Sequence, residues 1–358
     1  MRSRSSSKFS SGPTVEDLDS LFHAAGLARG MNHNSHKTKR SPRPERLISA
    51  VSEELFRPAR TARAAPNGVC WLPVPGWERF PWLWHGFSTR QGGLSRAYCS
   101  QGAPGELNLG FTAADGRETV LRNRRLLAEA VSGDPATPLV TVRQMHSNLA
   151  VRSRRAGAAH EPPLKADGLF TDEPGLLVAV LTADCIPVLV ADRKRRAVAA
   201  FHAGWRGTLK RIVETGVGRM RLEFGSQPED LVAAIGPGIG ACCYAVGEEV
   251  FSEFESQFHY ARTLFREVGS SDLVRAKYPL LFLSQRPPGH SNLGPSLHLD
   301  LMEANRRQLL AAGVNPGAIK VAGGCTSCQP EIFFSHRASG GRTGRQMAVI
   351  GIRGPARG

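Results

Sequence analysis

The sequence predicts an α/β domain with α+β-like character, in which mixed β-sheets are flanked by helices. Apolar runs rich in Val, Leu and Ile predict buried strands, and residues 175–192 form the longest of them. Helical periodicity recurs between these runs, but the alternation is too irregular for an open doubly wound sheet. An apolar share of 41% with mixed charge is typical of a globular protein. We therefore expect a single domain over residues 66–356.

The segments of this domain are predicted as follows. Residues 85–95 read as the end of a strand and a Gly-Gly turn, with Arg90 just before the turn. Residues 175–192 read as two strands that meet at a polar corner. The remaining expectations are a helix over 117–131, a strand running into a Gly-rich turn over 197–207, a helix over 208–224, a strand and Gly-Pro loop over 231–243, helices over 248–258 and 297–314, and a last strand before residue 353.

Residues 1–65 differ from this domain in composition and predict a basic, disordered extension. They are rich in Ser, Arg, Pro and His, and residues 1–64 hold 12 Lys/Arg against 6 Asp/Glu. The start resembles a transit peptide in its Arg and Ser content, but it lacks the apolar core of a secretory signal. Since no stretch approaches the roughly 20 apolar residues of a membrane span, we expect a cytoplasmic protein without a membrane partner.

The net charge of +15 favours anionic partners, phosphate among them. Beyond the extension this charge is diffuse, and no stripe of Lys and Arg interleaved with aromatic residues indicates a specific nucleic-acid partner. The seven cysteines are an odd number in a chain too long to need a disulfide framework. Reduced thiols in a cytosol are the expectation.

One thiol and two imidazoles form the candidate site. Cys185 and His202 lie in or at the ends of apolar strands, where an unbonded polar group costs free energy, and His146 lies where a short strand ends. Each alone has a structural explanation, as a small core residue or a histidine bonded to a backbone carbonyl. Together they suit Zn²⁺, which binds sulfur and nitrogen tetrahedrally and keeps one position open when catalytic.

Other charged residues are candidates for substrate or phosphate binding. Arg90 and Arg206 lie at turns flanked by glycine, and their guanidinium groups match phosphate oxygens if they lie near the metal. Asp167 and Asp184 are candidates for substrate contact or proton transfer. Asp184, next to a buried strand, fits the role of a structural hydrogen-bond acceptor equally well.

The remaining cysteines suggest a lesser role. Cys325 and Cys328 have the two-residue gap of zinc knuckles and redox pairs, but no second such pair exists, so we expect a structural or site-lining role. Cys242 and Cys243 are adjacent and would point to opposite faces of an extended chain, so we do not expect both to bind one metal. The loop at 236–240 lacks the lysine of a nucleotide-binding loop and reads as a tight turn.

Several blocks of sequence resemble the laccase-domain family, once called polyphenol oxidases and now mostly described as purine nucleoside phosphorylases with additional adenosine deaminase activity. In chain order they include HGFSTRQGG, RQMHS, ADGLFTD, LTADCIPVLVAD, FHAGWRG and CTSCQPEIFFSHRASGGRTGRQMAVI, and the resemblance spans residues 70–353. It implies that His146, Cys185 and His202 are zinc ligands. It also implies a fold similar to that of deamidating bacterial toxins.

The resemblance further implies the substrates. Adenosine, inosine or S-methyl-5'-thioadenosine would react with phosphate to give the free base and ribose 1-phosphate, and adenosine would be deaminated to inosine.

Two alternatives stay open. A metal-independent cysteine hydrolase or amidase would use Cys185 as nucleophile and His202 as base, and would not need His146. A copper-dependent polyphenol oxidase would need more histidines in tight motifs than this sequence offers. We expect a monomer or a homodimer.

Overall fold

The computed structural model describes residues 62–155, 163–268 and 296–354, all of which belong to the compact unit Leu47–Gly358. Most of the predicted extension, residues 1–61, lies outside the described residues. Its last part does not fit the prediction, because Arg63–Ala64 forms strand β1 and pairs with β2. The folded unit therefore already includes residues before 66.

Two six-stranded mixed sheets form the centre of this unit. The first has the order β1-β2-β3-β16-β8-β5, and only the β5–β8 pair is parallel. The second has the order β15-β11-β9-β10-β7-β6, with parallel pairs at β11–β15 and β6–β7. The strands of the first sheet are β1 (Arg63–Ala64), β2 (Cys70–Leu72), β3 (Leu83–Ser88), β16 (Gln346–Ile352), β8 (Leu176–Thr182) and β5 (Leu139–Val140). Those of the second are β15 (Ile319–Val321), β11 (Leu231–Ile235), β9 (Ile186–Asp192), β10 (Ala197–Ala203), β7 (Gly168–Thr171) and β6 (Ala150–Arg152).

The two sheets pack face to face and share one apolar core. Val178 and Val180 of β8 and Ile350 of β16 belong to the same buried cluster as Leu189 of β9 and Val198 of β10. Side chains alternate between the two faces of a strand, so the residues between these point outward. The long apolar run at 175–192 is explained by this arrangement, because β8 lies in one sheet, β9 lies in the other, and both faces of each sheet are covered.

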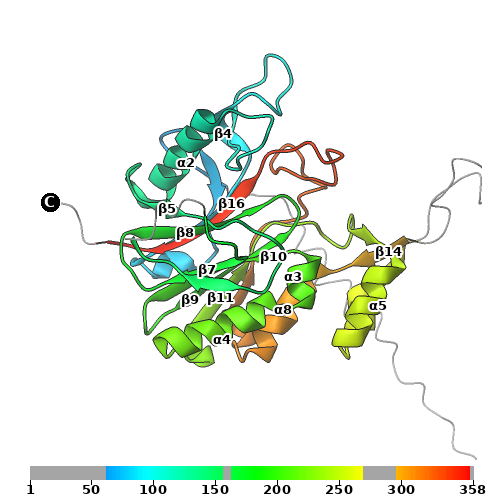
Figure 1. Ribbon diagram of the computed structural model, residues 1–358. Helices are drawn as coiled ribbons and strands as arrows, with labels where there is room; N and C mark the ends of the chain where they lie inside the picture. Colours follow the sequence, from blue (N-terminus) through cyan, green and yellow to red (C-terminus); the bar gives the residue numbers. More distant parts are fainter. Residues whose placement is uncertain (1–61, 156–162, 269–295, 355–358) are drawn as a thin grey trace, which may run out of the picture. The chain divides into compact units, whose positions relative to one another are not determined.

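Helices cover the outer faces, which completes four layers (Figure 1). Helix α2 (Arg117–Ser132) packs through Leu127 against the first sheet. Helices α4 (Ile212–Phe224) and α8 (Leu301–Ala311) pack against the second sheet. The predicted α/β fold with mixed sheets flanked by helices is confirmed.

The smaller elements lie around these layers. A three-stranded sheet has the order β12-β14-β13. Its strands are β12 (Ala245–Val246), β14 (Ser296–Leu299) and β13 (Phe265–Val268), and the other elements are β4 (Gln91–Ser95), α3 (Trp205–Leu209), α5 (Glu248–Gln257) and the short 3-10 helices Trp77–Arg79, Pro228–Asp230, Ala261–Leu264 and Pro316–Ala318.

Three sequence predictions were wrong in detail. The Gly-Gly pair after Arg90 lies within strand β4, where a Cβ on Gly93 would approach the Glu106 carbonyl oxygen to 2.3 Å. The predicted helix over 208–224 is two helices, α3 and α4, because Arg211 between them has a φ of 61°. The predicted helix over 297–314 begins only at Leu301, where the Asp300 side chain caps it by accepting the Glu303 N–H.

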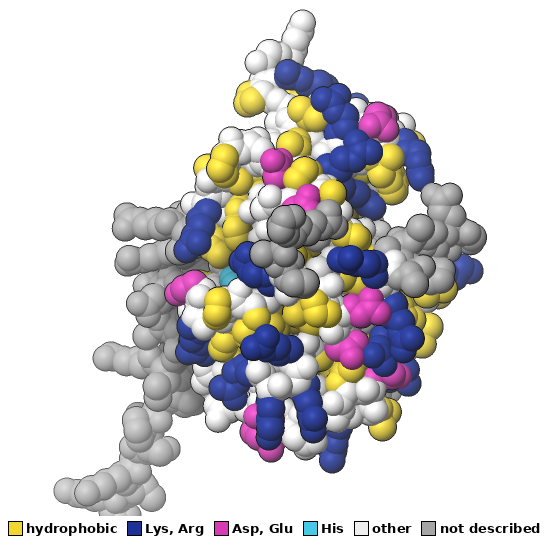
Figure 2. Space-filling model, turned by 90° about the vertical axis from the view of Figure 1, so that its left-hand side faces the viewer, with side chains coloured by type: hydrophobic (Ala, Val, Ile, Leu, Met, Phe, Trp, Pro, Cys, Tyr) yellow, Lys and Arg dark blue, Asp and Glu magenta, His cyan; other side chains and the backbone are white. Residues whose placement is uncertain are grey.

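The surface agrees with the diffuse charge expected from the sequence. Figure 2 shows Lys and Arg side chains spread over one face, with hydrophobic side chains and a few acidic ones between them. Within the described ranges, no helix has the length and apolar character needed to cross a bilayer.

His85 predicts how stability depends on pH. Burial in β3 lowers its pKa from 6.5 to about 4, and its Nδ1 accepts the Val74 N–H at 3.1 Å. The unfolded chain therefore binds a proton at a higher pH than the folded chain does. The contribution of neutral His85 to the free energy of unfolding is fully present above pH 6.5. As the pH falls toward 4, this contribution of about 3 kcal/mol is lost. Urea unfolding of the wild type and of His85→Gln at several pH values measures this loss. The same dependence of the free energy of unfolding on pH in both proteins would contradict the role of His85.

Candidate active site

Three distant segments bring one cysteine and two histidines together. His146 follows β5, Cys185 lies at the corner between β8 and β9, and His202 lies in β10. Their ligand atoms all lie within 4.8 Å of one another. The distance from Cys185 Sγ to His146 Nε2 is 3.8 Å, and the centroids of the two imidazole rings are 4.9 Å apart. These donors converge as a single metal ion would require.

The buried carboxylate of Asp167, just before β7, orients two of the three donor residues. Its oxygens accept the backbone N–H groups of Met145, His146 and Ser147 at 3.2, 2.9 and 2.6 Å, and the Ser147 hydroxyl at 2.7 Å. His202 Nδ1 lies 2.9 Å from the same carboxylate. Because Nδ1 donates to Asp167, Nε2 keeps its lone pair for a ligand bond.

Two of the turns that carry these donor residues adopt a left-handed backbone conformation. His146 has a φ of 58°, and Asp184, next to Cys185, has a φ of 89°. Such values cost free energy in residues other than glycine and persist where the surroundings enforce them. The surroundings of Asp184 do so, because its carboxylate accepts the Thr326 hydroxyl and the Arg337 N–H, each at 2.7 Å.

Gly204, which directly follows β10, lies against two of the donor residues, His146 and Cys185. A Cβ at this position would lie 2.8 Å from His146 Cδ2 and 2.9 Å from Cys185 Sγ, closer than atoms in proteins approach. Any larger residue would push these two ligands away, which explains the glycine of the HAGWRG block in physical terms.

Charges within the group favour a thiolate at Cys185. Burial alone would raise the pKa of this thiol, but the charge of His202 and a hydrogen bond with His146 lower it to about 6. Burial alone would lower the pKa of His202, but Cys185 and Asp167 raise it to about 9. Burial opposes ionisation of Asp167 as well, yet hydrogen bonds from His202 and Ser147 hold its pKa below the usual range. A thiolate is the form that binds metals or acts as a nucleophile.

The three residues line a cavity of about 780 Å³ that is rich in cationic and aromatic side chains. Asp184 is the only carboxylate among its described lining residues. The cavity is also lined by five arginines, Arg124, Arg143, Arg206, Arg337 and Arg345, and by the aromatic residues Phe111, Trp205 and Tyr244. None of the five arginines forms an ion pair with a carboxylate in the described ranges. This arrangement attracts anions.

The structure separates the sequence-predicted arginines. Arg206 lines the cavity, with its guanidinium 4.2 Å from the Trp205 ring centroid. Arg90 does not line it. Arg90 forms a 2.6 Å ion pair with Glu106, donates to the Pro330 carbonyl and lines a separate cavity of about 230 Å³.

The two predicted aspartates, Asp167 and Asp184, also differ in whether they line the cavity. Asp167 is fully buried, its oxygens accept hydrogen bonds from the loop and from His202, and it is not among the described residues that line the cavity. Asp184 lines the cavity, but its carboxylate accepts from Thr326 and Arg337. Its contacts are those of the structural acceptor considered from the sequence.

Four cavity arginines were missed by sequence reasoning: Arg124, Arg143, Arg337 and Arg345. They come from helix α2, the loop before His146 and the segment before β16, and an isolated arginine in such places looks like a surface residue. Only Arg143 could have been found from the sequence, because it precedes His146 by three residues. The other three arginines have no such neighbour.

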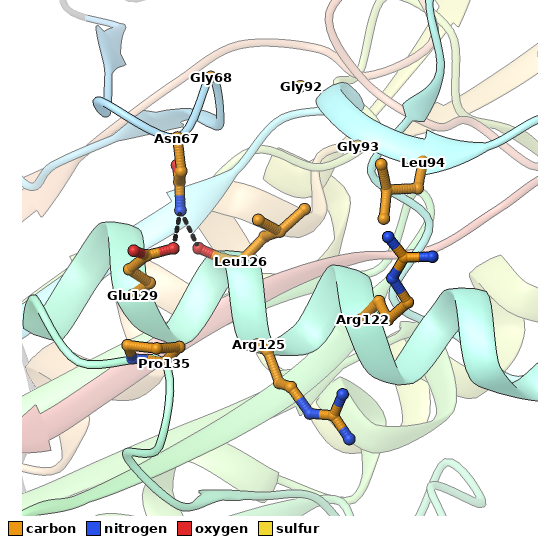
Figure 3. A pocket seen from close by; sticks show the side chains of 10 residues that line it. All are labelled: Asn67, Gly68, Gly92, Gly93, Leu94, Arg122, Arg125, Leu126, Glu129 and Pro135. Carbon is orange, nitrogen blue, oxygen red and sulfur yellow. Dashed lines mark hydrogen bonds between the residues drawn. The ribbon is translucent and has the colours of Figure 1, made fainter.

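A further cavity of about 530 Å³ lies between helix α2 and strand β4 (Figure 3). Asn67 crosses it and donates to the Leu126 carbonyl at 2.9 Å and to Glu129 at 2.8 Å. Its described lining includes Arg122 and Arg125 but neither histidine nor cysteine. It offers no comparable set of reactive groups.

Comparison with known proteins identifies the family. The family model described as "Multi-copper polyphenol oxidoreductase laccase" matches residues 84–353. The chain belongs to this family. Among curated relatives, "Purine nucleoside phosphorylase" of Bacteroides thetaiotaomicron is 37% identical over 75% of this chain and 91% of its own. "Purine nucleoside phosphorylase YlmD" of Geobacillus stearothermophilus is 35% identical over 75% of this chain and 89% of its own.

Two solved structures share the fold. The hypothetical protein YfiH of Bacillus licheniformis matches with a TM-score of 0.66 and 31% identity, covering 82% of this chain and 100% of that one. YlmD of Geobacillus stearothermophilus matches with a TM-score of 0.63 and 32% identity, covering 84% and 99%. The resemblance seen in the sequence blocks is confirmed.

Replacing Asp167 by Asn should destabilise the fold. Asn presents an NH₂ group where the carboxylate accepts buried N–H donors, and each hydrogen bond to a charged group contributes about 1.5–3 kcal/mol. We expect Asp167→Asn to lower the free energy of unfolding by about 3 kcal/mol or more. Urea unfolding measures the change. The control is Asp172→Asn, because Asp172 pairs with Arg152 near the surface and its side chain is 36% exposed. Equal losses in both variants would contradict the role of Asp167.

Proposed function

We propose that this protein is a zinc-dependent purine nucleoside phosphorylase with adenosine deaminase activity. Its substrates would be adenosine, inosine or S-methyl-5'-thioadenosine, with phosphate as the second substrate. The names of the curated relatives support the phosphorylase activity. The observation that carries the proposal is one cavity that combines the His146, Cys185 and His202 donors with five arginines.

The three donors fit zinc. One sulfur and two imidazole nitrogens within 4.8 Å of one another match the ligand types of a catalytic zinc site, with a fourth position left for substrate or water. Asp167 fixes the His202 tautomer, as the outer partner of a zinc-bound histidine usually does. When bound, zinc would supply Lewis acidity toward an anion or a water molecule.

The arginines would bind and orient phosphate. In phosphorolysis a phosphate oxygen forms a bond to C1′ of the ribose, the bond from C1′ to the purine nitrogen breaks, and the purine leaves with the electron pair and takes up a proton. We assign Arg206 to phosphate, because it lines the cavity at the start of α3, directly after the strand that carries His202. Its planar fork matches two phosphate oxygens and holds them against the sugar.

Aromatic side chains would bind the base. Phe111, Trp205 and Tyr244 line the same cavity, and purines stack on aromatic faces. Phe111 is 47% exposed at this cavity, and the guanidinium of Arg124, which also lines it, lies 4.4 Å from the Phe111 ring centroid. We infer that it contacts the nucleoside.

A metal-independent cysteine hydrolase is the second candidate, because the pKa of Cys185 is lowered to about 6 by its two histidines. A thiolate beside an imidazolium is a nucleophilic pair. The position of His146 argues against it, since a pair of Cys185 and His202 needs no third donor. The copper oxidase is less consistent with the site, because a multicopper centre needs several histidine-rich groups and the described residues hold one group with two histidines.

We further propose that the protein works in the cytoplasm, as a monomer or homodimer. All seven cysteines are free, as expected for a reducing compartment.

Metal content and activity should be lost together. We expect wild-type protein to retain zinc at the His146–Cys185–His202 group, and His146→Ala and Cys185→Ala to lose one zinc per chain and phosphorolysis together. Metal analysis after dialysis and an assay with inosine and phosphate measure this. Full activity of metal-free protein, abolished by iodoacetamide at Cys185, would support the cysteine hydrolase instead.

Two glycine variants control for general damage. Gly204→Ala keeps every ligand but places a methyl group against His146 and Cys185, so it should also lower zinc retention. Gly218→Ala in α4 places the same group in open space and should keep wild-type metal and activity.

The phosphate assignment can be tested through Michaelis constants. Loss of a charge-assisted hydrogen bond of about 1.5–3 kcal/mol predicts that Arg206→Gln raises the KM for phosphate by about 10- to 100-fold. The KM for the nucleoside should stay nearly unchanged. Arg122→Gln is the control, because Arg122 lines the cavity beside α2. An equal rise of both constants in Arg206→Gln would contradict the assignment.

A further inference from the structure

Four cysteines that the proposed reaction does not use form a second sulfur group. Ligand atoms of Cys242, Cys243, Cys325 and Cys328 all lie within 4.8 Å of one another. The sulfur of Cys328 is 3.5 Å from that of Cys242 and 3.3 Å from that of Cys243. None of the four lines the cavity of the candidate active site. All four are free thiols.

The topology explains why these residues meet. Strands β11 and β15 are parallel neighbours, with Ile235 paired to Val321, so the loops that follow them leave the sheet at the same end. The loops stay together, since Gly238 and Cys325 form a β-bridge and the Thr326 N–H donates to the Gly238 carbonyl at 3.0 Å.

A turn brings the two adjacent cysteines to one point, contrary to the expectation for an extended chain. Residues 241–243 form this turn, and the N–H groups of Cys243 and Tyr244 both donate to the Gly240 carbonyl, at 2.9 and 3.0 Å. The alternation of side chains that separates neighbours in a strand does not apply here. Both sulfurs therefore reach Cys328.

The spacing of the sulfurs fits one tetrahedral ion. Four thiolates about 2.3 Å from a zinc ion lie about 3.8 Å from one another, between the observed contacts and the outer limit of the group. The Gly240 N–H donates to the Cys325 sulfur at 3.2 Å, a contact that stabilises a metal-bound thiolate. Cys325 is buried, whereas Cys242 and Cys328 are exposed, so an ion can enter from solvent.

We propose that Cys242, Cys243, Cys325 and Cys328 bind a structural zinc ion, separate from the metal of the active site. Four sulfur ligands fill all positions of the ion, as in structural zinc sites. Binding releases the four thiol protons and leaves a site of net charge −2, which the basic chain offsets. Sulfur atoms this close leave room for one ion and not for an iron–sulfur cluster.

This zinc would hold one wall of the active-site cavity. Thr326, between two of its ligands, donates to Asp184, the neighbour of Cys185. Ile239 donates its N–H to the Asp184 carbonyl at 2.7 Å and itself lines the cavity. Both contacts come from the two loops that the ion would join.

The test uses a chain without the active-site ligands. We expect Cys185→Ala/His202→Ala, purified with a thiol reductant and without chelator, to retain one zinc per chain by elemental analysis. X-ray absorption at the zinc edge should show four sulfur neighbours at about 2.3 Å. Adding Cys328→Ser should remove this zinc and lower the Tm, whereas adding Cys70→Ser, outside both groups, should change neither.

Three results would overturn the proposal: a metal-free protein whose four thiols all react with a thiol reagent, a disulfide within the group under native conditions, or bound iron in place of zinc. The outcome does not depend on the proposed function. If the active site holds no zinc, the wild type retains one zinc with four sulfur neighbours; if the cysteine group holds none, it retains one zinc with a single sulfur neighbour.

Discussion

The buried carboxylate of Asp167 is the interaction on which the site depends. It lies directly before β7 and accepts hydrogen bonds from three successive backbone N–H groups, one hydroxyl and the His202 ring. The loop that carries His146 has no regular structure of its own, so these bonds determine where its imidazole lies. The same carboxylate selects which nitrogen of His202 faces the cavity. One desolvated charge thus orders two donors that are 56 residues apart in the chain.

The sandwich supplies the rigid frame for this interaction. Strand β8 leaves one sheet and β9 enters the other, so the corner between them projects Cys185 at the edge where both sheets end. Arginines from α2, α3 and the segment before β16 surround that edge. Asp184, which lines the cavity, accepts a hydrogen bond from Thr326, which lies between Cys325 and Cys328, so this bond connects the cavity to the neighbouring cysteine group.

The sequence predicted much of this, and the failures have physical reasons. Alternating and continuous apolar runs predicted the buried strands, because burial on one or both faces leaves a periodic signal. Residue type and position at strand ends selected His146, Cys185 and His202 as candidates, and the resemblance implied that they are zinc ligands, since three residues distant in the chain leave no spacing pattern. Periodicity could not show that Arg211 interrupts a helix, that the Gly-Gly pair lies in a strand, or that Arg90 pairs with Glu106. Adjacent cysteines were wrongly assigned to opposite faces because a turn, not a strand, carries them.

The most direct test of the central claim is anomalous diffraction at the zinc absorption edge, measured on crystals of the wild-type protein. We predict a peak within about 2.0–2.3 Å of Cys185 Sγ and of one ring nitrogen each of His146 and His202. The other ring nitrogen of His202 should still face Asp167. A map without density at this point, or a metal bound there without Cys185, would contradict the account.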